Sequence, residues 1–176
     1  VIRKGVGLRP AYLPQQVYFA NPHRNLIDTL IYDKNVSMQV ARNRLGSFQF
    51  TGETQMKTVD MLSGGEKSRL RLCELMYDPL NFLILDEPTN HLDVKYQLQL
   101  LNTVKSLDLT VVAAFHDLNL AGLYCDEIYV LKDGRVRAAG APWEVLTAPL
   151  IEEVYGVHAD ILPGKDGNPR IIYYAG

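Results

Sequence analysis

Two acidic residues follow a short apolar run near the middle of the chain. The run, Phe82–Leu85, lies between Asp78–Pro79 and Asp86–Glu87, and its composition predicts a fully buried parallel strand. Because α/β folds place ligands at the carboxyl ends of parallel strands, both carboxylates are expected to face a site. In phosphoryl transfer, one such acid holds Mg²⁺ and a neighbouring group orients the attacking water. The pair could also be only helix N-terminal acids after a strand.

A histidine follows the next predicted strand, Thr110–Phe115. Its position predicts that the imidazole of His116 lies at the same edge of the sheet, close to Glu87. A histidine at this place could sense or hold a terminal phosphate. A structural histidine, satisfied by its surroundings, is the alternative.

Two glycines lie between a serine and a glutamate in the segment Leu62–Glu66. Ser63 and Glu66 have the spacing of a capping box, which predicts that a helix starts here. Gly64 and Gly65 would leave backbone N–H groups bare at the helix N-terminus, where the dipole favours an anion. The alternative is a tight loop and a capped helix with nothing bound.

The N-terminal third must supply the elements around these residues. Pro10–Gln16 predicts the end of a strand, and a helix is expected to begin at Leu26 after a loop. Val36–Leu45 is compatible with a helix, and a loop is expected around Gly52. We interpret this region as a small helical subdomain.

The rest of the chain alternates helices and strands. Residues 70–76 have amphipathic spacing, Val94–Leu107 predicts a helix, and Asp133–Gly134 predicts the turn of a hairpin. The tail predicts two short helices, one starting near Pro142 and one ending at Gly156, and then two strands. The predicted strands of the hairpin and the tail are Glu127–Leu131, Arg135–Ala139, Ala159–Leu162 and Arg170–Tyr174.

Composition narrows the class of protein. The 176 residues are 47% hydrophobic and 22% charged, which is ordinary for one globular domain, and the net charge of −2 gives no electrostatic reason to expect nucleic acid. Cys73 and Cys125 lie in apolar contexts without a CxxC pattern, so we expect core residues. The longest apolar runs fall short of the roughly 20 residues that span a bilayer. Val1–Lys4 lacks a signal-peptide pattern, so we expect a cytoplasmic protein, and a first residue other than Met suggests that an upstream segment was removed.

Four segments taken in order resemble the ATP-binding-cassette (ABC) ATPase family. They are Tyr12–Gln15 (YLPQ), Leu62–Glu66 (LSGGE), Leu83–Asp93 (LILDEPTNHLD) and His116–Asp117. The resemblance covers nearly the whole chain. It implies an α/β fold, a partial P-loop NTPase fold with a mostly parallel sheet, a helical subdomain and a small C-terminal α+β appendage.

The resemblance also implies roles at an ATP and Mg²⁺ site. Gln15 matches the Q-loop glutamine, which in the family reaches Mg²⁺ and the attacking water. Asp86 matches the Walker B acid that holds Mg²⁺, and Glu87 matches the catalytic base. His116 matches the switch histidine.

Two further segments match residues that act across a dimer of cassettes. Ser63, Gly64, Gly65 and Glu66 match the signature, which contacts the γ-phosphate of ATP held by the opposite subunit. Asn90–Asp93 matches the D-loop, which touches the partner cassette. The expected partners are a second cassette in a homodimer and membrane permease subunits, without direct nucleic acid.

The family's phosphate-binding loop is missing from the sequence. The pattern G-x-x-x-x-G-K-[ST] fits neither Gly65–Ser68 nor Gly164–Asp166. The chain is expected to begin after the point at which a family member has completed its P-loop strand and helix. We therefore expect this chain alone to be inactive.

The chain resembles two subfamilies in different segments. Residues 42–93 resemble the F-type ABC proteins that act on ribosomes. Residues from Val111 onward, with Ala114–Ala121 and Gly140–Tyr155, resemble the ATPases of iron-siderophore, haem and vitamin B12 importers. A divergent importer, an engineered recombinant and a misassembled gene are all compatible with this mosaic.

The leading hypothesis is the ATP-hydrolysing subunit of an ABC importer for an iron chelate, haem or cobalamin, peripheral on the inner face of the membrane. The alternatives are an F-type ribosome-associated ATPase and an inactive fragment or recombinant. We predict four regions: the Q-loop strand at 1–16, the helical subdomain and signature helix at 17–76, the ATPase core at 77–140, and the appendage at 141–176.

Overall fold

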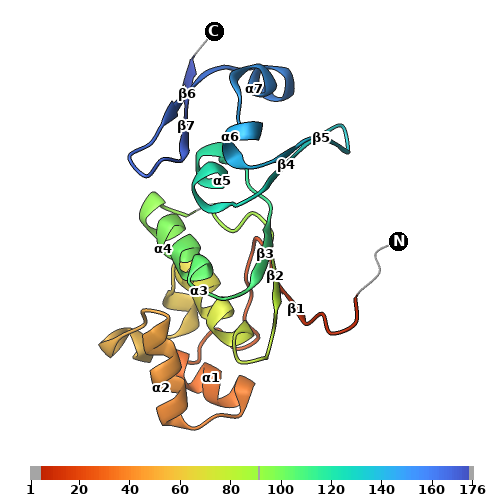
Figure 1. Cartoon of the computed structure of the whole chain (residues 1–176). Coiled ribbons are helices and arrows are strands. Elements are labelled where there is room, and N and C mark those ends of the chain that lie inside the picture. Colours follow the sequence, from red (N-terminus) through yellow and green to blue (C-terminus); the bar gives the residue numbers. More distant parts are fainter. Residues whose placement is uncertain (1–4, 91, 175–176) are drawn as a thin grey trace. The chain divides into compact units, whose positions relative to one another are not determined.

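The computed structural model describes residues 5–90 and 92–174, and the chain divides into two compact units between Ala114 and Phe115. The first unit contains β1 (Pro10–Leu13), α1 (Leu26–Lys34), α2 (Met38–Ser47), η1 (Gly52–Met56), η2 (Val59–Met61), α3 (Gly64–Leu75), β2 (Phe82–Leu85), α4 (Val94–Lys105) and β3 (Thr110–Ala113) (Figure 1). The second contains α5 (Leu118–Tyr124), β4 (Ile128–Lys132), β5 (Arg135–Gly140), α6 (Pro142–Val145), α7 (Ala148–Tyr155), β6 (His158–Pro163) and β7 (Pro169–Tyr174).

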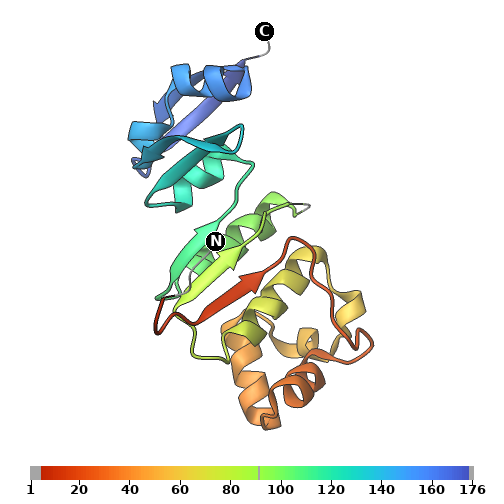
Figure 2. The same ribbon diagram turned by 90° about the vertical axis from the view of Figure 1, so that its right-hand side faces the viewer.

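The first unit is built on a parallel three-stranded sheet in the order β1-β2-β3 (Figure 2). The register pairs Tyr12 with Ile84, and Ile84 with Val112. The α/β fold with a parallel sheet is therefore confirmed.

Only one face of this sheet is covered by the described residues. Leu83 and Leu85 of β2 are 0% and 2% exposed and belong to a core that includes residues of α1, α3 and α4. On the opposite face Ile84 is 37% and Val112 is 54% exposed. The prediction that β2 is a fully buried strand is wrong, because successive side chains alternate between faces and the helices cover one of them.

Side-chain caps begin α1, α2 and α3 in this unit. The side chain of Asn25 accepts a hydrogen bond from the backbone N of Asp28 at 2.8 Å, and α1 starts at the predicted Leu26. Ser37 caps α2, which occupies most of the stretch predicted to be helical. The expected loop around Gly52 is wrong, because a 3₁₀ helix begins at this residue.

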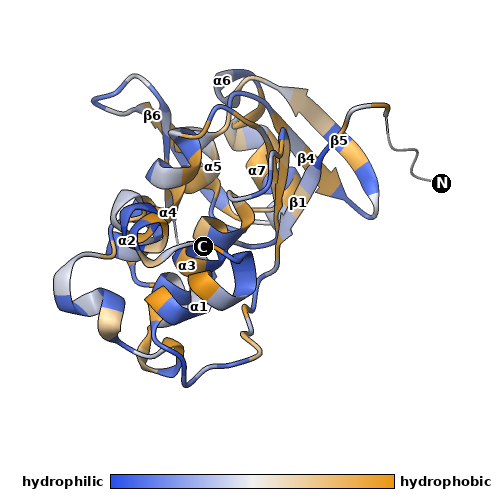
Figure 3. Ribbon diagram, turned by 90° about the horizontal axis from the view of Figure 1, so that it is seen from below, coloured by the Kyte–Doolittle hydropathy of each residue, from blue (hydrophilic) through white to orange (hydrophobic). Residues whose placement is uncertain are grey.

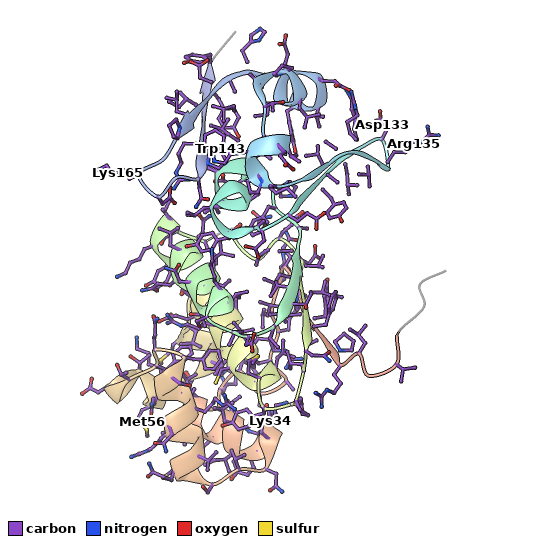
Figure 4. The ribbon with its side chains drawn as sticks, in the orientation of Figure 1. Lys34, Met56, Asp133, Arg135, Trp143 and Lys165 are labelled. Atoms are coloured by element: carbon purple, nitrogen blue, oxygen red, sulfur yellow. The ribbon has the colours of Figure 1, made fainter. Side chains whose placement is uncertain are left out.

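In the second unit the hairpin β4–β5 turns at Asp133 and Gly134, as predicted. Both residues have positive φ, 52° and 72°, which is the backbone of a type I′ turn whose twist suits the flanking strands. Asp133 lies at the tip of this hairpin (Figure 4). The hydropathy colouring shows apolar residues along the hairpin (Figure 3), and Leu131 and Val136, a cross-strand pair, are 64% and 58% exposed.

The tail also has the predicted elements. Helix α6 starts at Pro142, α7 ends with Gly156 in the left-handed conformation, and β6 and β7 form an antiparallel pair. Helix α5 is an element that the sequence reading did not name.

Each unit has its own apolar core. Cys73 is buried in the first core, and Cys125 is partly buried against the second, as expected for core residues. Burial raises the pKa of the Cys73 thiol to about 12. No helix within residues 5–90 and 92–174 combines the length and the apolar character needed to cross a bilayer.

Candidate functional site

Two of the predicted site residues meet where β1 and β2 end. The backbone N of Asp86 donates to the carbonyl of Leu13 at 3.0 Å and extends the parallel pairing by one residue. Just beyond, Nε2 of Gln15 donates to Oε2 of Glu87 at 2.6 Å, although the two residues are 72 positions apart in the chain. The carboxyl edge of the sheet therefore brings an amide and a carboxylate into direct contact next to Asp86.

Glu87 has an unusual backbone conformation. Its φ is 45°, and the left-handed region costs a residue with a side chain about 1–3 kcal/mol. The following turn holds it there, because the backbone N of Asn90 donates to the Glu87 carbonyl at 3.1 Å and Nδ2 of Asn90 donates to Oε2 of Glu87 at 3.0 Å. Strain of this kind concentrates at functional sites, and here it fixes the direction of the Glu87 side chain.

Tyr12 is a site residue that the sequence reading missed. Its hydroxyl donates to Oδ2 of Asp86 at 2.7 Å, and this hydrogen bond raises the pKa of Tyr12. The alternation of side chains along a strand could have indicated this contact, because Tyr12, Ile84 and Asp86 all fall on the same face of the parallel pair. Each of the two carboxylates thus already accepts a hydrogen bond from β1 or the loop that follows it.

The signature segment forms the predicted capping box. Oγ of Ser63 accepts from the backbone N of Glu66 at 3.3 Å, and Oε2 of Glu66 accepts from the backbone N of Ser63 at 2.8 Å. The N–H groups of Gly64 and Gly65 are not used by this box. The first turn of α3 therefore retains two donors in the orientation that binds anions.

Gly65 also has a packing role that the spacing did not reveal. A Cβ at this position would lie 3.1 Å from Cβ of Tyr96 and 3.3 Å from Cδ2 of Leu92. At Gly64 the nearest atom, Cδ2 of Leu92, would lie 3.6 Å away, an ordinary contact. Gly65 is therefore required by the close approach of α3 to the start of α4.

The D-loop segment lies between β2 and α4. Nε2 of Gln97 donates to the carbonyl of Thr89 at 3.0 Å and ties the start of this segment to α4. Asp93 is exposed at the N-cap position of α4. His91 lies outside the described residues. The contact of Asn90–Asp93 with a partner cassette stays a prediction.

His116 belongs to the second unit, where it is exposed. The next residue, Asp117, caps α5 by accepting from the backbone N of Asn119 at 2.8 Å and of Leu120 at 3.1 Å. The proximity of His116 to Glu87 remains a prediction, since the two residues lie in different units.

The fold is that of ABC-type P-loop NTPases. A chain of an ABC transporter in an inward-facing conformation matches with a TM-score of 0.76 and 18% identity, over 94% of this chain and 72% of that one. The ATP-binding cassette MJ0796, in a dimeric post-hydrolysis state with ADP and Pi, matches with a TM-score of 0.60 and 23% identity, over 77% of this chain and 63% of that one. Residues 3–90 match the family model described as "ABC transporter". The chain is thus a member of the ABC transporter family.

Several curated relatives are import proteins. The chain is 42% identical over 132 residues to the cobalamin import ATP-binding protein BtuD of Halobacterium salinarum, covering 73% of this chain and 31% of that protein. It is 37% identical over 133 residues to the ferric enterobactin transport ATP-binding protein FepC of Escherichia coli, covering 72% and 49%. It is 43% identical over 102 residues to the hemin import ATP-binding protein HmuV of Aliivibrio fischeri, covering 54% and 39%. The chain spans less than half of the length of each of these relatives. The resemblance of residues 42–93 to F-type proteins stays a prediction.

Proposed function

We propose that this chain is part of the energy-coupling ATPase of an ABC importer for an iron chelate, haem or cobalamin. The observation that carries the proposal is the hydrogen bond from Gln15 to Glu87 beside Asp86, in a chain similar to importer ATPases. Two segments 72 residues apart supply these groups. They meet at the edge of a parallel sheet where α/β folds bind their ligands.

The donor set at this edge suits Mg²⁺ in part. Within residues 5–90 and 92–174, no group of three or more His, Cys, Asp or Glu side chains could hold a metal ion. Asp86 and the amide oxygen of Gln15 would supply hard oxygen ligands, and Mg²⁺ commonly takes the rest of its shell from water and substrate phosphates. When bound, Mg²⁺ would supply positive charge that offsets the charge on the phosphates.

The proposed catalytic work falls to Glu87. Its carboxylate would accept the proton of the attacking water, and Gln15 and Asn90 hold that carboxylate by hydrogen bonds of 2.6 and 3.0 Å. A base placed in this way contributes roughly 10²–10⁴-fold to a rate. His116 is proposed to hold the terminal phosphate.

The signature is proposed to act on nucleotide bound by the opposite cassette. The N–H groups of Gly64 and Gly65 would donate to the γ-phosphate, and the cap formed by Ser63 and Glu66 holds them in place. Because the sequence contains no P-loop pattern, this chain would contribute only the signature half of a composite site. The proposed assembly is a homodimer of cassettes beneath permease subunits on the cytoplasmic face of the membrane.

The experiment joins the P-loop segment of FepC in front of residues 1–176 and measures phosphate release with Mg²⁺ and ATP. We expect hydrolysis that Glu87→Gln lowers by roughly 100-fold or more, because the proton acceptor is lost while the shape is kept. Glu53→Gln, an exposed glutamate of η1, is the matched control and is expected to leave the rate unchanged. Equal rates in the Glu87→Gln and unsubstituted proteins would refute the assignment.

A further inference from the structure

The side chain of Asn119 is bound to the backbone of the C-terminal hairpin. The backbone N of Ile171 donates to Oδ1 of Asn119 at 2.7 Å, and Nδ2 of Asn119 donates to the carbonyl of Ile171 at 3.1 Å. Ile171 is only 5% exposed, so its backbone groups need partners within the protein. The carboxamide of Asn119 therefore takes the place of a neighbouring strand beside β7.

Further contacts join α5 and α6 to the C-terminal hairpin. A Cβ on Gly122, one turn after Asn119 on the same face of α5, would lie 3.1 Å from Cδ1 of Leu146 and 3.4 Å from Cγ and the carbonyl oxygen of Pro169. Trp143 of α6 donates from Nε1 to the carbonyl of Gly167 at 2.8 Å and secures the turn between β6 and β7 (Figure 4). Helix α5 thus meets β7 at a close, specific contact.

The contact lies next to His116 in the chain. Asp117 caps α5 directly after the histidine, and Asn119 follows two residues later. Burial and the nearby Asp117 carboxylate raise the pKa of Tyr173, which places β7 close to this cap as well. The backbone on the C-terminal side of His116 is therefore fixed by the cap and by the bonds from Asn119 to β7.

We propose that Asn119 is a positioning residue that uses the C-terminal hairpin as a support for the backbone carrying His116. The proposal rests on the proposed role of His116 and gives a function to a residue of the Ala114–Ala121 segment that the proposed chemistry does not use. A displacement of β7 would then change the environment of the His116 imidazole, although no residue of β7 takes part in the chemistry.

The test follows hydrogen exchange by mass spectrometry in the chain of residues 1–176, without nucleotide. Amide exchange in the peptide that contains Ile171 reports on the hydrogen bonds between Asn119 and Ile171. Deuterium exchange at the imidazole Cε1–H of His116, measured as a function of pH, reports on the environment of the ring. A general loss of stability would not by itself shift this pH profile. His23 in the first unit serves as the internal reference.

Asn119→Leu keeps the shape of the side chain and removes both hydrogen bonds. We expect amide exchange at Ile171 to rise roughly tenfold, because a buried donor has lost its acceptor. We also expect the pH profile of His116 to shift while that of His23 is unchanged. Asn43→Leu, on the exposed surface of α2, is the matched control and should alter neither readout.

An unchanged His116 profile with faster Ile171 exchange would overturn the proposal, because the hairpin would then move without the histidine. Unchanged Ile171 exchange would overturn it as well. If Asn119→Leu does not fold, Asn119→Ala carries the test with the same two outcomes, since it also removes both hydrogen bonds to Ile171. No hydrolysis is measured, so failure here is distinct from failure of the Glu87 experiment.

Discussion

The two faces of the first unit's sheet are both apolar, yet their exposure is opposite. Leu13, Leu83 and Leu85 are 1%, 0% and 2% exposed beneath the helices. Directly behind them, Tyr12 and Ile84 are 50% and 37% exposed. Parallel sheets are normally covered on both faces, so the open face has the composition of an interior without its burial.

The candidate site belongs to the open face. Asp86 follows Ile84 on that side of β2, and Tyr12 donates to it from the same side of β1. The covered face packs against helices of the first unit, whereas the open face carries Asp86, the residue proposed to hold Mg²⁺. The comparison shows that local hydrogen bonds can position the side chains of the site although no described element covers this face of the sheet.

The largest expected effect concerns hydrolysis by residues 1–176 alone. We expect no ATP hydrolysis above background, because positioning and charge neutralisation of the γ-phosphate provide most of this chemistry and the P-loop supplies much of both. Phosphate release with and without Mg²⁺ measures it. A Mg²⁺-dependent turnover that Glu87→Gln abolishes would contradict this prediction, because the chain would then hydrolyse ATP without a P-loop.

The second prediction distinguishes the effect of the signature on dimerisation from its effect on ATP affinity. In the protein with the FepC P-loop segment, Ser63→Arg should abolish ATP-driven dimerisation and leave ATP affinity within about twofold, because the signature acts on the partner's nucleotide. Light scattering and a nucleotide-binding titration measure the two quantities.

Ser37→Arg is the control, since it also removes a serine cap, at the start of α2. Both substitutions are expected to cost about 1 kcal/mol of stability. Dimerisation that survives Ser63→Arg would refute the assignment of Leu62–Glu66.

Substitutions at neighbouring residues of β2 allow a direct comparison of how much each face contributes to stability. Leu83→Ala should lower the free energy of unfolding by about 2–5 kcal/mol, because it opens a cavity in the core. Ile84→Ala should cost about 1 kcal/mol or less, since its side chain is already partly in water. Urea denaturation measures both. Equal costs would mean that the open face is covered in solution.

The smallest effect is a pH dependence within the covered region. Glu74 of α3 is 2% exposed, and burial raises its pKa above 4.5 although Arg71 donates to Oε2 at 2.9 Å. The neutral form is therefore favoured in the folded state. Its contribution to stability is complete below pH 4.5 and is lost as the pH rises through the raised folded value.

Glu74→Gln should remove this decline and flatten the dependence of unfolding free energy on pH above 4.5. Urea denaturation at several pH values checks it. Glu53→Gln, at an exposed position, should leave the dependence as it was. A decline that persists unchanged in Glu74→Gln would assign it to another group.

Interactions within a few residues were predictable from the sequence. The box of Ser63 and Glu66 and the turn at Asp133 and Gly134 depend on spacings of three residues or fewer, so the local sequence determines them. The acids after β2 could be placed at a sheet edge because strand direction fixes which ends meet.

Contacts between distant segments could not be predicted in the same way. Tyr12 reaches Asp86 across 74 positions, and Gly65 is required by Tyr96 of another helix. The exposure of Ile84 was also beyond the sequence, because an apolar run shows that a strand can be buried and does not show which elements cover it.

Sedimentation velocity combined with thermal melting of residues 1–176 tests most directly whether the open face is an uncovered interior. We predict self-association at micromolar concentration, since the exposed apolar side chains of the open face and the edge of β3 that no described strand pairs favour association with other chains. Ile84→Thr with Val112→Thr should reduce the association. A monodisperse monomer with a cooperative transition at roughly 45–65 °C would contradict the account.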